Sequence, residues 1–380
     1  MSSAKVLKNK RFLFLLPTLE MMGGAERQAL YLADHLVREQ GCKVKIWGLH
    51  NGQGFRRYLA DNGYDFGVSP FRWPCRKRTY LQCLPRFAAA ARKFKPDVLM
   101  GYTYAPGIAA GLVWRLTGTR TCIWNQRAAW NAHGDSLAER LALSWTPCFI
   151  SNSSSGKEFL VSELGVPEAK VEILRNGCRK DRARLGRRQW RERLNIPEHR
   201  LMAVMLANFR KPKDHVGLLE AWKSVAEKLP GPKPVLVLAG SDGGDLGRVR
   251  KTAAELEVGG LVRFPGYMED NFGLLEAADL YVHCSHEEGN PNGLIEAMLC
   301  GLPAVGSNIP GIRECLPPES WQCLAGAGQS EELAERLLML LETPELRDKL
   351  GSDNREYAER HFSMRSMAEN YMDYFARRLD

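Results

Sequence analysis

The segment HEEGNPNGLIEAMLCGLPAV, residues 286–305, places carboxylates on both sides of a turn that leads into an apolar helix. Glu288 lies before the turn, and Glu296 follows it with seven residues between them. The preceding run ADLYVHCS has the composition of a buried strand, and GLIEAMLCG that of a helix. The amides that open a helix have no acceptor within it and attract anions, so those of Asn292 to Ile295 are suited to a phosphate group.

Glu288 and Glu296 therefore flank a predicted phosphate site. Carboxylate oxygens accept hydrogen bonds from hydroxyl groups, so the pair suits a ligand with a sugar at one end of its phosphates and a ribose at the other. A solvent-exposed position on the helix is the alternative for Glu296. Its neighbours Ile295, Ala297 and Met298 are apolar and argue against that alternative.

Two other loops carry groups that bind anions. ANFRKPKDH, which follows the apolar run LMAVML, contains Arg210, Lys211 and Lys213. A guanidinium offers a planar fork of donors and an ammonium offers a compact charge, and both suit a diphosphate. In LEMMGGAERQ, Gly23 and Gly24 leave space for a ligand beside the backbone and precede a predicted helix. The alternative for the first loop is a solvated loop without a ligand. The alternative for the Gly23-Gly24 pair is an ordinary turn.

Short apolar runs alternate with helical patterns in both halves of the chain, which is typical of α/β proteins with a parallel, doubly wound sheet. The 380 residues are too many for one ordinary core. We therefore predict two Rossmann-like domains, residues 1–185 and 198–363, that face each other across a cleft. An arginine-rich linker lies within 179–197, and the C-terminal helix 364–380 packs back on the first domain. Such sheets bind ligands beyond the carboxyl ends of their strands, where the three loops lie.

The net charge of +9 is concentrated in two segments. Residues 70–96, PFRWPCRKRTYLQCLPRFAAAARKFKP, mix basic and aromatic residues without an acid, a pattern that suits an anionic membrane surface as well as nucleic acid. The second segment, RKDRARLGRRQWRER, occupies residues 179–193. Solvated helix faces are an equal alternative for the first segment and the favoured interpretation of the second. The sequence contains no nucleic-acid recognition module, so we expect no nucleic-acid partner.

The ten cysteines are scattered without a C-x-x-C motif, which predicts buried free thiols in a reducing cytoplasm. The N-terminal run FLFLLP is shorter than the ~7–15 apolar residues of a signal-peptide core and is expected to be the first buried strand. No run reaches the ~18 apolar residues that would span a bilayer. We expect a cytoplasmic protein that does not cross a membrane.

The motif EGNPNGLIE resembles the Glu-x7-Glu signature of the retaining glycosyltransferases of family 4, which have the GT-B fold. Similar segments extend over nearly the whole chain. They are GGAERQ, CFISNSSSGKEFL, VEILRNG, FRKPKDHVGLLEAW, LVLAGSD, VRFPGY, EAADLYVHCS, EEGNPNGLIEAMLCGLPAV and PGIRE. The number and order of these segments make the resemblance specific.

The resemblance implies roles for individual residues. Glu288 would hold hydroxyls of the donor sugar, while Arg210 and Lys213 would hold the diphosphate, and we expect these three to carry catalysis. Glu296 would hold the ribose, and the backbone of residues 264–267 the base. The donor-binding residues implied in all are Gly23, Gly24, Arg127, Phe264, Tyr267, Asn292, Gly293, Leu294 and Glu296.

The chain departs from the family pattern in two places. Relatives often carry the phosphate-binding arginine where this chain has Asn208, so Arg210 would act from two residues later. Many relatives also have a histidine at the end of the strand that here reads CIWNQRAAW, where this chain has Gln126 and Arg127. Arg127 would then contact the sugar or the phosphates.

The resemblance further implies transfer of a sugar from a nucleoside diphosphate to an acceptor hydroxyl with retention of anomeric configuration. The frequency of donors in the family favours UDP over GDP. No metal or other cofactor is expected, which agrees with the missing D-x-D motif. Closure of the two domains would assemble the phosphate site, and His286 and His133 are expected to be ordinary loop histidines.

The acceptor is expected to meet the first domain. Segment 70–96 suggests a saccharide or lipid-linked acceptor anchored in the membrane, with the enzyme on the inner face, in the synthesis of a cell-surface polysaccharide or glycolipid. A nucleotide-sugar epimerase or hydrolase is one alternative, but no titratable group is securely placed for proton abstraction. A non-catalytic binding subunit is the other, and the complete set of phosphate- and sugar-binding residues argues against it.

Overall fold

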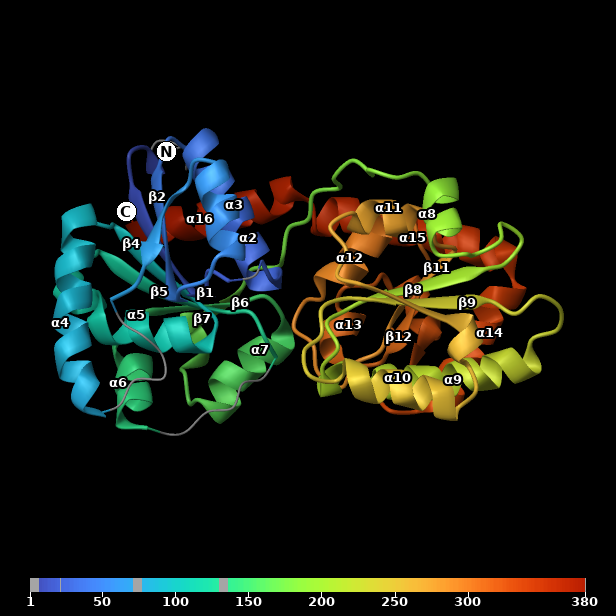
Figure 1. Ribbon diagram of the computed structural model, residues 1–380. Coiled ribbons are helices and arrows are strands. Elements are labelled where there is room, and N and C mark those ends of the chain that lie inside the picture. Colours follow the sequence, from blue (N-terminus) through green and yellow to red (C-terminus); the bar gives the residue numbers. More distant parts are fainter. Residues whose placement is uncertain (1–6, 21, 71–76, 130–135, 380) are drawn as a thin grey trace. The chain divides into compact units, whose positions relative to one another are not determined.

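The computed structural model describes residues 7–20, 22–70, 77–129 and 136–379, with the backbone alone at 77–81 (Figure 1). The chain divides into two compact units. Unit 1 consists of Met1–Gly177 together with Met364–Asp380, and unit 2 of Cys178–Ser363. Each unit is a parallel sheet with helices on both faces.

Over its described residues, unit 1 has a seven-stranded parallel sheet with the order β3-β2-β1-β4-β5-β6-β7. The order reverses between β1 and β4, as in a doubly wound sheet. The strands are β1 (Arg11–Thr18), β2 (Lys43–His50), β3 (Asp65–Val68), β4 (Val98–Tyr102), β5 (Thr121–Gln126), β6 (Cys148–Ser151) and β7 (Val171–Ile173). The α-helices are α2 (Gly24–Arg38), α3 (Gly54–Asp61), α4 (Lys77–Phe94), α5 (Tyr104–Thr117), α6 (Leu137–Trp145), α7 (Ser154–Glu158) and α16 (Met364–Leu379).

Both faces of this sheet are buried, which explains the continuous apolar run at its first strand. In β1, Phe12 and Phe14 pack in a core with α2, α3 and α16. The alternate residues Leu13 and Leu15 pack with α4, α5 and α6 on the other face. Figure 1 shows these two layers of helices on opposite sides of the sheet. A strand covered on both faces needs apolar residues at every position, and FLFLLP supplies them as the predicted first buried strand.

Helix α16 belongs to unit 1 although it follows unit 2 in the sequence. Its side chains Met367, Tyr371, Tyr374 and Phe375 are buried in the core that contains β1, β4 and α2. The rings of Phe375 and Phe12 lie 5.0 Å apart. In Figure 1, α16 (red) lies beside the first strands of the chain (blue). The apolar stripe of this helix therefore closes one face of the first sheet.

Phe375→Ala is expected to destabilise unit 1 by about 3–5 kcal/mol, because the substitution removes a fully buried ring and leaves a cavity. Thermal unfolding should show a lower midpoint. Glu369→Ala is the matched control, since this side chain is 63% exposed on the same helix and forms an i,i+4 ion pair with Arg365. The control should cost no more than about 0.5 kcal/mol. Equal midpoints for the two variants would show that α16 does not stabilise the sheet.

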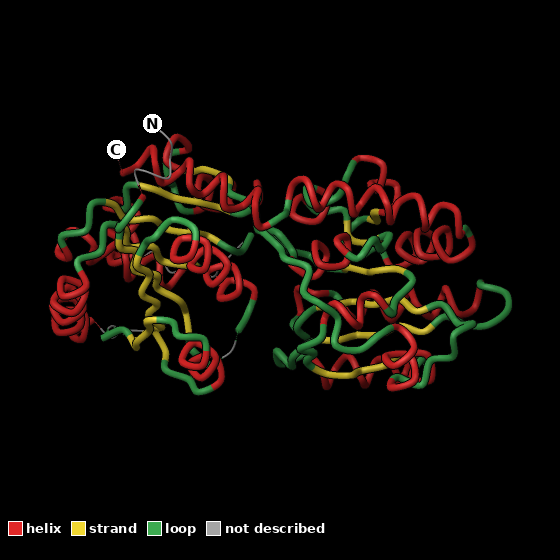
Figure 2. Tube along the Cα trace, turned by 90° about the horizontal axis from the view of Figure 1, so that it is seen from above, coloured by secondary structure: helices red, strands yellow, loops and turns green. Residues whose placement is uncertain are grey.

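Unit 2, whose residues are all described, has a six-stranded parallel sheet with the order β10-β9-β8-β11-β12-β13. The strands are β8 (Met202–Leu206), β9 (Val235–Ala239), β10 (Val262–Gly266), β11 (Leu280–His283), β12 (Ala304–Ser307) and β13 (Leu324–Ala325). The α-helices are α8 (Arg187–Arg193), α9 (His215–Lys228), α10 (Leu246–Glu255), α11 (Asn271–Glu276), α12 (Asn292–Leu299), α13 (Pro310–Arg313), α14 (Ser330–Glu342) and α15 (Pro344–His361). Figure 2 shows the strands of this unit (yellow) between its helices (red).

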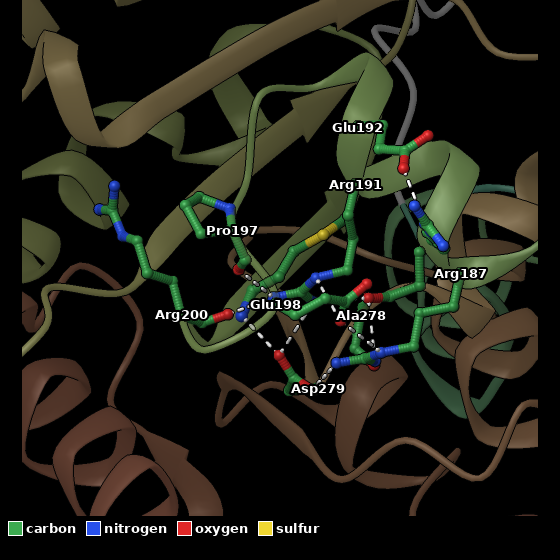
Figure 3. A network of polar contacts seen from close by, with 11 residues as sticks. Arg187, Arg191, Glu192, Pro197, Glu198, Arg200, Ala278 and Asp279 are labelled. Carbon is green, nitrogen blue, oxygen red and sulfur yellow. Dashed lines mark hydrogen bonds and ion pairs between the residues drawn. The ribbon is translucent and has the colours of Figure 1, made fainter.

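The predicted linker is part of unit 2, so the boundaries at 185 and 198 are wrong. Helix α8 lies within that segment, and its Trp190 is only 2% exposed in the core of unit 2. The prediction of a solvated basic face is also wrong for Arg191, which is 1% exposed. Arg191 donates to the carbonyl oxygens of Ala277 (3.0 Å) and Pro197 (3.1 Å) and pairs with two carboxylates, which Figure 3 shows around its guanidinium. Pro197 and Glu198 follow closely in the sequence, but Ala277 and Asp279 are 86 and 88 residues away, and the local composition did not reveal those partners.

The prediction of exposed aromatics in segment 70–96 is wrong for Phe87. This ring is fully buried on the inner side of α4 and makes an edge-on contact with Trp47, at 5.2 Å between ring centroids. Phe94 is half-buried beside the ammonium of Lys45. Phe71 and Trp73 lie outside the described residues, as does the side chain of Tyr80. Helix α4 nevertheless exposes basic residues, namely Arg86, Arg92 and Lys93, followed by Lys95 just beyond its end.

Candidate active site

The strand order of unit 2 reverses between β8 and β11. In sheets of this kind the loops that follow the two strands at the reversal diverge and leave a binding position at the carboxyl edge. The loop after β8 carries Arg210 and Lys213, and the loop after β11 carries Glu288. The sheet topology thus brings together side chains that are 75 residues apart in the sequence.

Glu288 is the centre of this arrangement. Its Oε1 atom is contacted by the ammonium of Lys213 and, at 2.6 Å, by Nε2 of His283. The other ring nitrogen of His283 lies 3.0 Å from the hydroxyl of Tyr281. An ionised carboxylate only accepts hydrogen bonds, so Nε2 donates to Glu288. Tyr281, His283 and Glu288 therefore form a chain from the strand to the loop.

Two opposing influences set the pKa of Glu288. Burial raises it, because its side chain is only 9% exposed, whereas the charges and hydrogen bonds of Lys213 and His283 lower it. The balance lowers the pKa to about 2. The carboxylate is therefore ionised over the whole physiological range.

Backbone contacts hold the two loops together. The hydroxyl of Ser285 donates to the carbonyl oxygen of Pro212 at 2.8 Å, and the amide of His286 donates to the same oxygen at 2.8 Å. On the other side of the loop, a Cβ at Gly311 would lie 2.2 Å from the carbonyl oxygen of Glu288, so only glycine fits there. These contacts fix the backbone of the two loops that carry Lys213 and Glu288.

Arg210 is exposed, and its guanidinium makes no hydrogen bond or ion pair with the described residues. Lys213 lies three residues further on, at the end of a 3-10 turn that spans Lys211–Lys213. Asp214 then caps α9 by accepting from the amide of Gly217 at 3.1 Å. Asn208, two residues before Arg210, accepts from the amide of Ser241 at 3.3 Å. The loop thus offers Lys213, which is paired with Glu288, and two cations exposed to solvent, Arg210 and Lys211.

The start of α12 lies directly after the loop that carries Glu288. Its N-cap is Pro291, whose side chain makes no capping hydrogen bond. The first backbone bond of the helix is donated by Ile295 to the carbonyl of Pro291, at 3.2 Å. The amides of Gly293 and Leu294 precede this bond and have no acceptor in the helix. The predicted amide of Ile295 is therefore taken up by a hydrogen bond of the helix, whereas those of Gly293 and Leu294 have no acceptor in it.

Gly293→Ala is expected to weaken binding of a nucleoside diphosphate about tenfold or more, because the first turn of α12 has to shift. A Cβ at this position would lie 2.6 Å from the hydroxyl of Tyr281 and 2.7 Å from the carbonyl oxygen of Leu206. A shift of that size removes charge-assisted hydrogen bonds from the amides. Titration with UDP measures the effect. Gly247→Ala is the control, since a Cβ there meets nothing within 4 Å, and equal affinities for the two variants would contradict the prediction.

Glu296 lies one turn inside α12 and is only 3% exposed, so the alternative of a solvent-exposed glutamate is wrong. One of its oxygens accepts from the side-chain amide of Asn271 at 3.1 Å. Asn271 opens α11, which follows the strand that contains Phe264. Phe264 packs 6.2 Å from Phe209, whereas Tyr267 is 55% exposed just beyond the strand. The 264–267 stretch and Glu296 thus lie at the same carboxyl edge as the charged loops.

The remaining predicted residues, Gly23, Gly24 and Arg127, belong to unit 1. The amide of Gly23 donates to Oε2 of Glu26 at 3.1 Å, so a buried carboxylate of the same helix already occupies it. Burial raises the pKa of Glu26, and hydrogen bonds from the amides of Glu26 and Gly23 act in the opposite direction. Arg127 follows β5 and contacts the side chains of Asn125, Asn176 and Tyr371.

Two sequence models match consecutive parts of this chain. The model described as Glycosyltransferase Family 4 matches residues 22–182, and the model described as Glycosyl transferases group 1 matches residues 186–357. The chain belongs to the group 1 glycosyltransferases of family 4.

This glycosyltransferase is similar to curated and solved proteins over nearly its full length. It is 26% identical to the lipopolysaccharide core biosynthesis glycosyltransferase LpsD of Rhizobium meliloti, over 93% of this chain and 95% of that protein. The solved structure of HepE from Anabaena with UDP and glucose superposes with a TM-score of 0.83 at 18% identity, over 97% of this chain and 100% of that chain. The lipopolysaccharide outer core galactosyltransferase WaaB superposes with a TM-score of 0.72 at 15% identity, over 97% and 99%. The fold of the glycosyltransferase is GT-B.

Sequence reasoning missed three residues near the site of the glycosyltransferase. They are His283, which contacts Glu288, Tyr281, which contacts His283, and Asn271, which contacts Glu296. His283 and Tyr281 belong to a strand whose sequence is typical of an ordinary buried core. The alternation of side chains along β11 is the signal that could have found His283, because it lies on the same face as Tyr281. His286 pairs with Asp214 at 3.7 Å, and His133 lies outside the described residues.

Among the described residues of the glycosyltransferase, no group of three or more histidine, cysteine or acidic side chains is arranged to hold a metal ion. A search of the same residues finds no helix with the length and hydropathy needed to cross a membrane.

Proposed function

We propose that this glycosyltransferase moves a sugar from a nucleoside diphosphate, UDP rather than GDP, to a hydroxyl of a saccharide or lipid-linked acceptor and retains the anomeric configuration. The carrying observation is the convergence of Lys213 and His283 on the Glu288 carboxylate, beside the uncapped start of α12 and the unpaired Arg210. Cations and amides at that edge suit a diphosphate, and the carboxylate suits sugar hydroxyls. HepE was solved with UDP and glucose, and its fold is the same.

In this proposal the leaving diphosphate receives its charge stabilisation from unit 2. Arg210, Lys213 and the amides of Gly293 and Leu294 act on the oxygens where negative charge develops. When the diphosphate binds, the ammonium of Lys213 moves from Glu288 to a phosphate oxygen. Glu288 then keeps His283 as a partner and accepts hydrogen bonds from hydroxyls of the donor sugar.

The reaction follows a front-face path. The bond between the anomeric carbon and the diphosphate oxygen breaks, and the sugar gains oxocarbenium character. The acceptor hydroxyl forms its bond on the same face, and its proton passes to the departing phosphate. No protein nucleophile takes part, and we propose that no metal does, because the cationic side chains fill that role. Glu296, held by Asn271, accepts from the ribose hydroxyls.

A donor screen tests this function. The protein is incubated with a panel of UDP- and GDP-sugars in EDTA, and thermal stabilisation and nucleotide release are measured. A crude lipid extract serves as acceptor, with product detection by mass spectrometry and its anomeric configuration by NMR. Stabilisation and transfer with a UDP-sugar support the proposal. Conversion of the donor to an epimer or to free sugar would favour an epimerase or hydrolase, and binding without turnover would favour a binding subunit.

The acceptor proposal concerns helix α4 of unit 1. Arg86, Arg92, Lys93 and Lys95 are exposed along this helix and at its end. Basic residues near an anionic membrane surface contribute about 1 kcal/mol each, and the attraction falls with salt. LpsD and WaaB are named for the lipopolysaccharide core, which is compatible with an acceptor at a membrane. We therefore propose that the enzyme acts in the cytoplasm, on the inner face of a membrane.

Flotation with liposomes that contain anionic lipid is expected to recover the protein at low salt and to lose it at high salt. Charge reversal of two exposed residues of α4, Arg86→Glu with Lys93→Glu, should abolish recovery. Charge reversal of Lys251 and Arg336 in unit 2 keeps the same net charge and should leave recovery unchanged. Absence of the wild-type protein from the liposome fraction at low salt would rule out the membrane contact.

A further inference from the structure

Unit 1 has a polar cluster at the carboxyl ends of β4, β5 and β6 and in the segment after β7. Carboxyl ends of parallel strands are the positions at which sheets of this class bind ligands. The cluster is contained within unit 1, because α16 supplies its last member. Its side chains are Tyr102, Asn125, Arg127, Asn152, Asn176 and Tyr371.

Arg127 carries the charge of this cluster and is held by neutral partners. Its Nη1 donates to Oδ1 of Asn125 at 3.5 Å and to the hydroxyl of Tyr371 at 3.4 Å, and its Nη2 donates to Oδ1 of Asn176. Within the described part of the chain, no carboxylate lies within ion-pair distance of this guanidinium and its Nε makes no hydrogen bond. The edge of the guanidinium formed by Nε and the second hydrogen of Nη2 therefore has donors to offer to a ligand.

Arg191 in unit 2 shows how the same chain neutralises a structural arginine. The carboxylates of Asp279 and Glu198 lie 3.4 and 3.3 Å from its guanidinium, and backbone carbonyls take its other donors (Figure 3). Burying a charge is costly unless a counter-charge accompanies it. Arg127 is half-buried and fixed from three elements without such a partner. Its environment is that of a cation whose counter-charge arrives with a ligand.

Two buried polar atoms of the same cluster also lack partners among the described residues. They are the hydroxyl of Tyr102, in a residue 1% exposed, and Oδ1 of Asn152, in a residue 2% exposed. Asn152 reaches Arg127 through Asn176, because its amide donates to the Oδ1 atom that Arg127 also contacts. Buried polar atoms are seldom left without a hydrogen bond, so these atoms indicate a polar occupant, either water or ligand hydroxyls.

We propose that Arg127 binds an anionic group, a phosphate or a carboxylate, of the acceptor saccharide. The inference rests on the proposed glycosyl transfer and names the chemical class of its acceptor. It departs from the expectation that Arg127 binds the donor, because unit 2 supplies its own cations for the diphosphate at Arg210 and Lys213. A planar guanidinium with an open edge matches the two oxygens of a phosphate or a carboxylate.

The test measures anion binding with the donor site filled. The full-length protein is saturated with UDP and then titrated with inorganic phosphate in one arm and malonate in the other, followed by NMR of the ligand. Arg127→Gln is expected to weaken binding of the preferred anion at least about tenfold, whereas Arg127→Lys should keep part of it. Arg120→Gln is the matched control, since this exposed arginine lies at the opposite end of the same strand. Unfolding midpoints measured without anion verify that the variants fold.

The outcomes separate this proposal from the proposed function. Anion binding that persists under UDP and depends on Arg127 supports the acceptor site, and the stronger arm tells phosphate from carboxylate. Equal anion binding by the wild type and Arg127→Gln overturns the proposal. Loss of the Arg127-dependent signal when UDP is added also overturns it, because Arg127 would then belong to the donor site. Failure of UDP itself to bind would count against the proposed function instead. Once an acceptor is known, Arg127→Gln should raise the KM for that acceptor and leave the KM for the donor unchanged.

Discussion

Glu288→Gln is expected to lower kcat about 100- to 1,000-fold, the range found when one preorganised polar contact to a transition state is removed. The wild-type carboxylate receives Lys213 and His283 on one oxygen. A glutamine at this position offers one acceptor oxygen and no charge. Lys213 therefore loses its counter-ion, and the donor-sugar hydroxyls lose an anionic hydrogen-bond acceptor. Steady-state kinetics with the donor found in the screen measure the effect.

The neighbouring residue provides the control for this prediction. Glu287 has the same chemistry and is exposed. Glu287→Gln should leave kcat within about twofold. Substitutions at exposed positions of this kind change the free energy of unfolding by no more than about 0.5 kcal/mol. If both variants kept wild-type kcat, Glu288 would have no part in the reaction.

Lys213→Ala is expected to weaken UDP binding at least about tenfold and to lower kcat as well, because a charge-assisted contact to the diphosphate is lost. Lys211 is the matched control, since it lies in the same 3-10 turn and its side chain is exposed. Lys211→Ala should keep its affinity for UDP within about threefold. Calorimetric titration with UDP compares the two, and equal affinities would remove Lys213 from the phosphate site.

The same variant should also change the pH dependence of the reaction. In the wild type, burial favours protonation of Glu288, but Lys213 and His283 lower its pKa to about 2. The ion pair therefore contributes its full stability above the ordinary glutamate pKa of 4.5 and loses it as the pH falls toward 2. Without Lys213, burial is opposed by His283 alone, and the pKa of Glu288 rises. The acid limb of the profile of kcat/KM against pH, which reports the free enzyme, should move upward in Lys213→Ala and stay in place in Lys211→Ala.

The sequence predicted those features of the site that depend on local pattern and on the position of loops in a parallel sheet. Apolar neighbours indicated the burial of Glu296, and the alternation of strands and helices placed Lys213 and Glu288 at one edge. Contacts between distant segments could not be predicted in this way. Arg191 is buried beside the carboxylate of Asp279, which lies 88 residues away in the sequence. The local run RKDRARLGRRQWRER gives no indication of that partner.

The sequence also could not show which acceptor a backbone amide would bind when a side chain of the same segment competes with a ligand. The Gly-Gly pair before α2 was expected to expose amides to a ligand, but the carboxylate of Glu26 reaches back to the amide of Gly23. Both arrangements satisfy the same amide, and only the geometry of the first turn decides between them. His283 likewise reads as a strand residue until its contact with Glu288 is seen.

The most direct test is a crystal structure of the protein with an intact UDP-sugar or a non-transferable analogue. We expect the diphosphate at the first turn of α12, with Lys213 moved onto it from Glu288 and Arg210 alongside. Glu288 should then accept hydrogen bonds from the sugar, and Glu296 from the ribose. A diphosphate bound away from α12, with Lys213 still paired to Glu288, would contradict the account.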